Sequence, residues 1–261
     1  MRQSKYYLVF MLIVIFYSSC LKNQKNRVVE EYYPGGTIKS EIAMTDTMRN
    51  GLAKYYSEQG HLLSTAEYKN DKREGLVINY NPENGKITAK AFYKNDEQNG
   101  EVIQNYKEGM LFRTSTYVNG RVNGVIKTFW PNGQLKAENT FNMGKPAIGL
   151  KEYDMHGKPI IQPELLIKEI NQTALHRKLI LKFSLSDGNK DVDFYLDELD
   201  DGKYFDPKSY KLRNDDGISS IEYPVFPGNK LFKNISIIAK LKTNYGNTLI
   251  LQRNYKLNIV N

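Results

Sequence analysis

The stretch FWPNGQLKAENTF, from Phe129 to Phe141, has the pattern of half a β-hairpin. Two aromatic residues lead into the turn sequence Pro131-Asn132-Gly133, and apolar and polar residues then alternate up to the last aromatic. Related stretches occur at four other places: YYPGGTIKSEIAM, YYSEQGHLLSTAEY, NYNPENGKITAKAFY and NYKEGMLFRTSTY. One element that recurs five times along a chain predicts a repeat architecture.

Two series of glycines give the period of these repeats. The first follows the turns at intervals of 24, 25, 24, 24 and 24 residues: Gly36, Gly60, Gly85, Gly109, Gly133 and Gly157. The second has intervals of 24, 25, 24 and 25 residues: Gly51, Gly75, Gly100, Gly124 and Gly149. Asn precedes glycine at five of these positions: Asn50, Asn84, Asn99, Asn123 and Asn132. Because Asn-Gly is the strongest short-range hairpin signal, we expect both series to mark hairpin turns with positive φ.

The segments between the turns alternate like strands with one buried face. Every second position follows the order aliphatic, small, small, large, as in Leu62-Ser64-Ala66-Tyr68 and Ile87-Ala89-Ala91-Tyr93. The positions between them are mostly polar, and this period of two predicts β-strands. A single hairpin cannot bury its apolar face, whereas five or six stacked hairpins build a continuous sheet.

The repeats resemble the MORN repeat (membrane occupation and recognition nexus), in particular its bacterial second variant. The resemblance rests on an aromatic, a Gly turn, the pattern G-x-x-x-x-aromatic and a second Gly, as in YKNDKREGLVINYNPENGKI and YVNGRVNGVIKTFWPNGQLK. It covers about residues 30–159. It implies a hairpin-repeat fold and, because such bacterial proteins are often described as antitoxin components or as plain repeat lipoproteins, one of those two roles.

The net charge of +8 is concentrated in the N-terminal tail. Residues 1–27 contain five basic side chains and no acidic one. Residues 28–159 contain 17 basic and 16 acidic side chains, and residues 160–261 contain 15 and 13. A nucleic-acid-binding protein concentrates Lys and Arg on its folded surface, because phosphate neutralisation supplies the affinity. We therefore expect no nucleic-acid partner.

The N-terminal segment has the three parts of a secretory signal. A basic start is followed by an apolar run of ten residues from Leu8 to Tyr17 and by SSC at 18–20. A membrane span needs about 20 apolar residues, so this run is too short to be one. The end of the segment resembles a bacterial lipobox, with Tyr17 where that motif prefers Leu. The resemblance implies that residues 1–19 are removed and that Cys20 becomes a lipidated N-terminus.

Lipidation of Cys20 would place the protein in the bacterial cell envelope, on the periplasmic or surface face of a membrane that we expect to be the outer one. Two or three acyl chains hold a protein stably, at about 0.8 kcal/mol per buried methylene. A lone buried cysteine is the alternative, but no core element surrounds this position in the sequence. Cys20 is also the only cysteine, so the folded parts are held together without disulfides.

The 24-residue period stops at about residue 160, and the remaining segment is the size of one small domain. Six runs in it are suited to strands: 164–170, 178–185, 192–199, 218–226, 235–243 and 248–260. Asp-Gly, Pro-Gly and Tyr-Gly-Asn turn sequences separate several of them, which predicts a β-sandwich. We therefore expect an all-β chain, with a tether at 20–29, an elongated sheet of hairpin repeats at 30–159 and a sandwich-like domain at 160–261.

The sequence offers little for catalysis. Its three histidines lie beside turn glycines or in a polar loop, and no G-x-S-x-G nucleophile motif occurs. We expect no enzyme activity and no cofactor. The alternative is a hydrolase in the C-terminal domain, with His176 and Asp197 as the residues to test.

One acidic segment has partial EF-hand spacing. Four oxygen-bearing side chains occupy positions 1, 3, 5 and 12 of such a loop: Asp187, Asn189, Asp191 and Glu198. Val192 replaces the glycine required at position 6, and the flanking segments are predicted strands. Solvated loop acids are therefore the favoured interpretation, with calcium as the alternative, and we predict no metal site.

Aromatic residues recur with the period, and we expect most of them to cover the sheet. Four are candidate anchors for a protein partner in an exposed groove: Tyr56, Tyr80, Tyr106 and Trp130. The sequence thus predicts a non-catalytic, membrane-anchored lipoprotein whose repeats act as a protein-interaction scaffold. The alternative is an antitoxin or immunity protein that neutralises a partner toxin.

Overall fold

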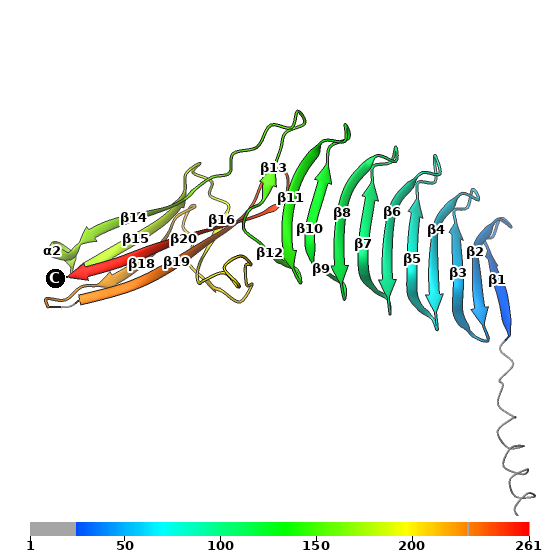
Figure 1. The fold of residues 1–261 in the computed structure, drawn as a ribbon, viewed down its shortest axis with the longest axis horizontal. Helices are drawn as coiled ribbons and strands as arrows, with labels where there is room; N and C mark the ends of the chain where they lie inside the picture. Colours follow the sequence, from blue (N-terminus) through cyan, green and yellow to red (C-terminus); the bar gives the residue numbers. More distant parts are fainter. Residues whose placement is uncertain (1–24, 229, 261) are drawn as a thin grey trace, which may run out of the picture.

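The computed structural model describes residues 25–228 and 230–260. Strands make up 63% of the chain and helix 2%, which confirms the predicted all-β fold class. Figure 1 shows two parts: N-terminal strands that cross the long axis of the molecule, and C-terminal strands that run along it. The predicted signal segment and Cys20 lie outside the described residues.

The N-terminal part is one antiparallel sheet in which successive strands lie side by side. Its longer strands are β1 (Asn26–Tyr32), β2 (Ile38–Thr45), β3 (Met48–Tyr56), β4 (Leu62–Lys69), β5 (Lys72–Tyr80), β6 (Ile87–Lys94), β7 (Glu97–Asn105), β8 (Leu111–Val118), β10 (Gly124–Phe129) and β11 (Leu135–Asn142). Three short strands complete it: β9 (Arg121–Val122), β12 (Lys145–Pro146) and β13 (Lys151–Glu152). The sheet begins four residues before the expected start at residue 30, because Val28 and Val29 pair with Ala43 and Ile42. Residues 26–29 therefore belong to a strand and not to a tether.

The first glycine series lies in turns that join successive strands at one end of the strands, as predicted. In five of the six loops the glycine N–H donates to the carbonyl three residues earlier, for example Gly36 to Tyr33 (2.9 Å) and Gly133 to Trp130 (2.8 Å). Gly133 has φ 84°, which fits a type I turn closed by a left-handed residue. The loop of Gly85 is one residue longer, which explains the single interval of 25 residues in this series.

The second glycine series does not form hairpin turns, so that prediction is wrong. Four of its members lie within or at the start of strands, opposite an aromatic residue of the next strand: Gly51, Gly75, Gly100 and Gly124. These glycines have φ angles of 110–120°, and the pairing with the preceding strand shifts register beside Gly51, Gly75 and Gly100. An added Cβ at Gly100 would lie 3.2 Å from the Cβ of Phe92. Glycine is needed for the bulge and the close approach. At the strand ends opposite to the first glycine series, the chain reverses in two-residue turns with positive φ, such as Asn70-Asp71 and Asn95-Asp96.

A row of small and aliphatic residues runs along the middle of the sheet on one face. Its members pair directly across neighbouring strands, and we call it the central row: Val29, Ile42, Ala53, Ala66, Val77, Ala91, Val102 and Ser115. Ala53 is fully buried and Ala66 is 4% exposed, although the sheet is a single layer in Figure 1. Larger neighbours on the same strands therefore cover this row, as the alternation of small and large residues predicts.

The C-terminal part consists of two sheets that share one core. One sheet has the order β14 (Leu165–Gln172), β15 (Lys178–Leu185), β18 (Ser219–Pro224), and the other has β17 (Tyr210–Lys211), β16 (Val192–Leu196), β19 (Lys230–Lys242), β20 (Thr248–Val260). A single turn of helix, α2 (Thr173–His176), joins β14 to β15. Phe183 and Phe194 from the two sheets are fully buried in the shared core. The arrangement is that of a β-sandwich, and β19 starts at Lys230, five residues before the predicted run.

Candidate interaction surface

The side of the repeat sheet that carries the central row also carries a row of aromatic side chains, and we call it the aromatic face. Its aromatic residues are all half-buried: Tyr55, Tyr68, Tyr93, Tyr117 and Phe141. Most polar residues between them are neutral, for example Ser64, Asn79, Gln104 and Thr128. Burial raises the pKa of Tyr55 to about 12, and its hydroxyl lies 3.3 Å from that of Tyr68. The face thus combines ordered aromatic rings with short hydrogen-bonding groups.

Arginines near the two-residue turns, at one end of the strands, connect neighbouring repeats. The Arg49 guanidinium lies 4.2 Å from the Tyr68 ring centre and donates to Asp71 in the next turn. The same arrangement recurs one repeat later, where Arg73 lies 4.1 Å from the Tyr93 ring centre and donates to Asp96. Hydrogen bonds from the backbone and side chain of Arg73 lower the pKa of the Asp96 carboxyl. The repeated geometry holds each two-residue turn against the preceding repeat.

At the opposite edge, two of the predicted anchors hold the repeats together. The Tyr106 hydroxyl donates to the carbonyl of Phe129 (2.8 Å), and Trp130 Nε1 donates to the carbonyl of Tyr153 (3.1 Å). Tyr33, which was not among the candidates, makes the equivalent bond to Tyr56 (2.8 Å). Each donor and its acceptor are 23 residues apart, so these bonds run from one repeat to the next.

The other two predicted anchors lie at the ends of odd-numbered strands. The Tyr56 hydroxyl donates to Glu41 (2.8 Å), which also pairs with Lys54 (3.0 Å). Burial, and then the bond to Glu41, raises the pKa of Tyr56. Tyr80 is half-buried at the end of β5. The structure does not bring the four candidates into one groove, and their role in binding a partner stays a prediction.

An open groove of about 650 Å³ lies where the aromatic face meets the sandwich. Tyr117 and Phe141 of the aromatic row line it together with Val122 and Met143. Arg121, Lys145, Asp206 and Lys208 add charged side chains to its lining. Protein-binding surfaces commonly combine apolar and aromatic residues with polar and charged ones. We take this groove, with the aromatic face that leads to it, as the candidate interaction surface.

The tip of the long β19–β20 hairpin closes the end of the repeat sheet. Tyr245 at this tip packs edge-on against Trp130, with ring centres 5.4 Å apart, and Lys136 Nζ lies 4.4 Å from the Trp130 ring centre. Asn139 Nδ2 donates to the carbonyl of Thr248 (3.2 Å). Trp130, a predicted anchor for a partner, therefore contacts the chain's own C-terminal domain.

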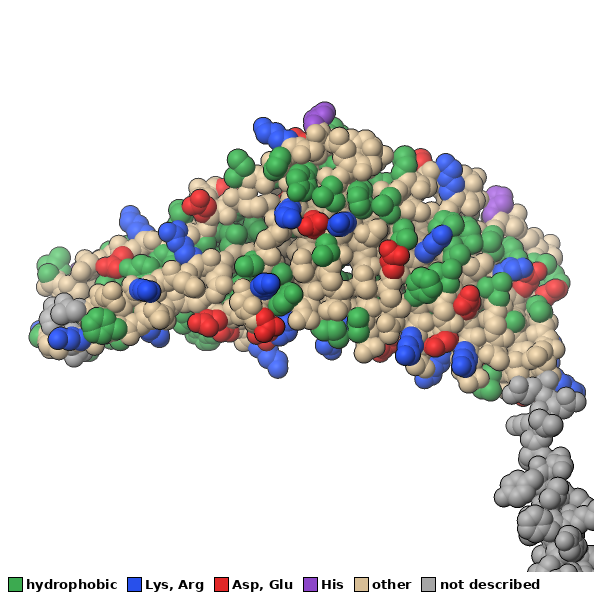
Figure 2. Space-filling view, viewed as in Figure 1, with side chains coloured by type: hydrophobic (Ala, Val, Ile, Leu, Met, Phe, Trp, Pro, Cys, Tyr) green, Lys and Arg blue, Asp and Glu red, His purple; other side chains and the backbone are tan. Residues whose placement is uncertain are grey.

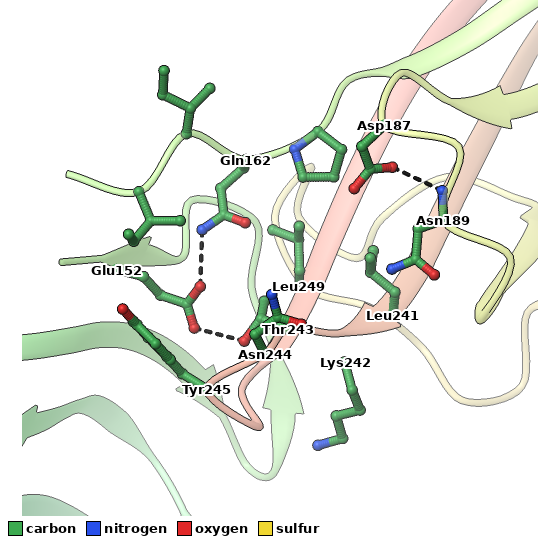
Figure 3. Close-up of a pocket in the computed structure, with 13 residues that line it drawn as sticks. Glu152, Gln162, Asp187, Asn189, Leu241, Lys242, Thr243, Asn244, Tyr245 and Leu249 are labelled. Atoms are coloured by element: carbon green, nitrogen blue, oxygen red, sulfur yellow. Dashed lines mark hydrogen bonds between the residues drawn. The ribbon is translucent and has the colours of Figure 1, made fainter. Parts of the chain in front are cut away.

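A buried carboxylate lies at the same joint. Glu152 is 3% exposed, and Oε1 accepts hydrogen bonds from Thr243 Oγ1 (2.6 Å) and Asn247 Nδ2 (2.7 Å). Oε2 accepts one from Gln162 Nε2 (3.1 Å). Figure 3 shows Glu152 between Gln162 and Thr243, beside a small cavity of about 180 Å³ that Lys242 also lines. Because both carboxylate oxygens accept hydrogen bonds, Glu152 connects the repeat sheet to the β19–β20 hairpin of the sandwich.

A second connection is formed by Lys145 in β12. Its ammonium group donates to Asp206 (2.8 Å) and to Asp200, both in the loop between β16 and β17. These hydrogen bonds raise the pKa of Lys145, and the bond from Lys145 lowers the pKa of Asp206. A backbone hydrogen bond from Phe205 N–H to the carbonyl of Pro146 (2.9 Å) reinforces the contact.

Outside the joint the surface has mixed charge. Figure 2 shows acidic, basic and apolar side chains interspersed over the repeat strands on one face.

Within the described residues no helix is long and apolar enough to cross a bilayer. No group of three or more His, Cys, Asp and Glu side chains in this part of the chain could hold a metal ion. In the acidic segment, Asn189 N–H donates to Asp187 and Asp191 N–H donates to Asn189, which closes consecutive side-chain turns.

The comparisons with known proteins agree with this fold. The family described as a MORN repeat variant matches residues 49–70 and 122–143. The chain carries this repeat at two places. Such repeats are generally modules for protein or membrane interaction and are typically non-catalytic. A search of curated proteins finds no match to the chain.

Sequence reasoning did not predict that residues of the repeats and of the sandwich meet at the joint and the groove. Glu152 and Thr243 are 91 residues apart, and nothing in the local pattern links them. Three exposed apolar residues on the face opposite the central row were also missed: Leu52, Phe92 and Val125. A signal for these three existed, because each is apolar at a position where the alternation is otherwise polar.

Proposed function

We propose that this protein is a membrane-anchored interaction scaffold of the bacterial cell envelope, tethered through lipidated Cys20. In this proposal its repeat sheet and the adjoining groove bind a protein partner. The observation that carries it is the groove lined by Tyr117 and Phe141 at the end of the aromatic face. Rigid aromatic rings with small neutral polar groups provide contact area at low entropic cost, as in antibody paratopes.

The binding surface is tested by site-specific photocrosslinking in cells. A photoreactive phenylalanine analogue at Tyr117 should give a discrete protein adduct, which mass spectrometry identifies. The same analogue at Phe92, which is 47% exposed on the opposite face, is the control. Equal adducts at both positions, or none at Tyr117, would count against the groove.

The anchor is tested separately by fractionation. Cys20→Ala should move the protein from the membrane to the soluble fraction, whereas a wild-type protein that is already soluble would contradict the anchor. An antitoxin role, implied only by the resemblance, requires the cross-linked partner to be toxic in the absence of this protein. Expression of that partner alone tests the point.

A further inference from the structure

The first strand of the repeat sheet has an open edge within the described residues. There β1 pairs only with β2, and six of its seven residues are exposed, including Val28 at 64%. The Asp46 N–H donates to the carbonyl of Lys25. Hydrogen-bonded pairs alternate along an antiparallel ladder, so the backbone groups of every second residue from Lys25, including Val29, point toward β2. The N–H and C=O groups of Val28 and Glu30, which lie between them, therefore point to the open side.

We propose that this edge pairs with the same edge of a second copy of the chain, in antiparallel register about Val29. A two-fold axis perpendicular to the sheet then passes between the two Val29 residues, and the aromatic faces of both copies lie on the same side. Val28 of one copy exchanges backbone hydrogen bonds with Glu30 of the other. The two repeat sheets become one continuous sheet.

The charges of β1 select this register. With Val29 opposite Val29, Arg27 of each copy lies directly opposite Glu31 of the other, which gives two oppositely charged pairs. A shift of two residues one way puts Glu30 opposite Glu30, and a shift the other way puts Arg27 opposite Val29. Charges on an edge strand normally discourage random pairing, but here they complement one arrangement. Glu31 also lies 3.5 Å from Lys39, where more than half of each side chain is exposed, so it stays accessible to the second copy.

The central row supplies a second reason for this register. Val29 is the last member of that row and the only half-buried residue of β1. Every inner member pairs with a neighbour on both sides, whereas Val29 pairs only with Ile42 among the residues that the structure describes. The second copy's Val29 would complete the row, so that small and aliphatic residues run without a break through both copies. A doubled sheet presents two aromatic faces side by side, with a sandwich at each far end.

The register is tested by cysteine cross-linking of the full-length chain. Because Val29 is a non-hydrogen-bonded pair in this register, the two Cα atoms lie about 4.5 Å apart, within the range of a disulfide. Val29→Cys should therefore form a disulfide-linked dimer under mild oxidation. Val28→Cys is the control, since position 28 is more exposed but faces Glu30 of the second copy. The wild-type chain shows how much cross-linking Cys20 contributes.

Charge reversal tests the pairing without a covalent bond. Arg27→Glu should raise the dimer dissociation constant measured by sedimentation equilibrium about tenfold, because two attractive pairs become repulsive. Glu31→Arg should have the same effect, and the double variant Arg27→Glu/Glu31→Arg should restore the affinity. Cross-linking that is equal at positions 28 and 29, failure of the double variant to restore the dimer, or a wild-type chain that is monomeric up to its solubility limit would each overturn the proposal.

Discussion

The repeat sheet and the sandwich are both built of β-strands, but their stability has different sources. In the sandwich, Phe183, Phe194 and Ile237 are fully buried between two sheets. In the repeat sheet the most deeply buried side chains are small, such as those of Ala53 and Ser40, and the aromatic residues of the aromatic face are only half-buried. Hydrogen bonds between neighbouring repeats take the place of a deep core there, such as those of Tyr106 and Arg49.

The difference shows how a single-layer sheet can be stable at all. Each repeat contacts only its neighbours, so its stability is a sum of similar terms along the array. The sandwich instead depends on contacts that all strands share, and one substitution in its core affects the whole domain. Substitutions in the two parts of the molecule therefore test this contrast.

The first prediction compares two phenylalanines. Phe183→Ala should reduce the free energy of unfolding of the sandwich by about 3–5 kcal/mol, because it removes a fully buried ring and leaves a cavity. Phe92→Ala, at a ring that is 47% exposed on the repeat sheet, should change stability by less than about 1 kcal/mol. Urea unfolding of both variants measures the two values. Similar losses at the two sites would show that the repeat sheet has a core like that of the sandwich.

The second prediction concerns the bulge glycines. Gly51→Ala should cost about 1–3 kcal/mol, because alanine is strained at this positive φ. Its Cβ would also lie 3.0 Å from the Cβ of Ala43, whereas at Gly124, with a similar φ, the nearest atom is 4.0 Å away. Gly124→Ala should therefore cost less than Gly51→Ala in thermal unfolding. Gly35→Ala, with no neighbouring atom within 4 Å and no positive φ, is the control and should be close to neutral.

The third prediction concerns the joint between the two parts. Glu152→Ala removes an acceptor for Thr243, Asn247 and Gln162 and should cost about 1.5–3 kcal/mol, the range for hydrogen bonds to charged groups. We expect calorimetry to show one coupled unfolding transition for the wild type and two separate transitions for Glu152→Ala. Glu138→Ala removes exposed ion pairs and should cost less than about 1 kcal/mol. A single unchanged transition in Glu152→Ala would mean that the joint does not couple the two parts.

The fourth prediction is a pH dependence with a smaller effect. The pKa of Asp206 is lowered in the folded protein, so its bond to Lys145 stabilises the joint above the ordinary value of 3.8 and is lost as the pH falls through the lowered value. The pKa of Lys145 is raised from 10.5, so its contribution is present below that value and is lost as the pH rises through the raised one. Lys145→Met should therefore lower Tm between about pH 4 and pH 10, and the difference from the wild type should shrink as the pH falls below about 3.8. A Tm difference that is constant from pH 2 to pH 7 would contradict this assignment.

Much of the repeat sheet could be predicted from the sequence, because its pairing is local. The period, the strand alternation and the turns before Gly36 and Gly133 all depend on residues no more than 25 positions apart. The second glycine series was misread because Asn-Gly marks hairpin turns in most sequences. Here Gly51 and Gly100 lie opposite aromatic residues, and the positive φ serves a bulge.

The joint and the groove could not be predicted, since their residues come together only through the tertiary fold. Trp130 had the composition of a partner-binding anchor, yet its ring packs against Tyr245, 115 residues later in the chain. Likewise, the groove needs Tyr117 from the repeats and Lys208 from a loop of the sandwich. The contacts of the joint and the groove do not recur from repeat to repeat, so the repeat period gives no signal for them.

The hydrogen bonds from one repeat to the next, such as that of Tyr33 to Tyr56, give the array a direction as well as a period. Three units donate toward their C-terminal neighbours in this way, through Tyr33, Tyr106 and Trp130, and the acceptor of the last bond is Tyr153. Because each unit adds two strands, the number of units sets the distance from β1 to the sandwich in steps of about 10 Å.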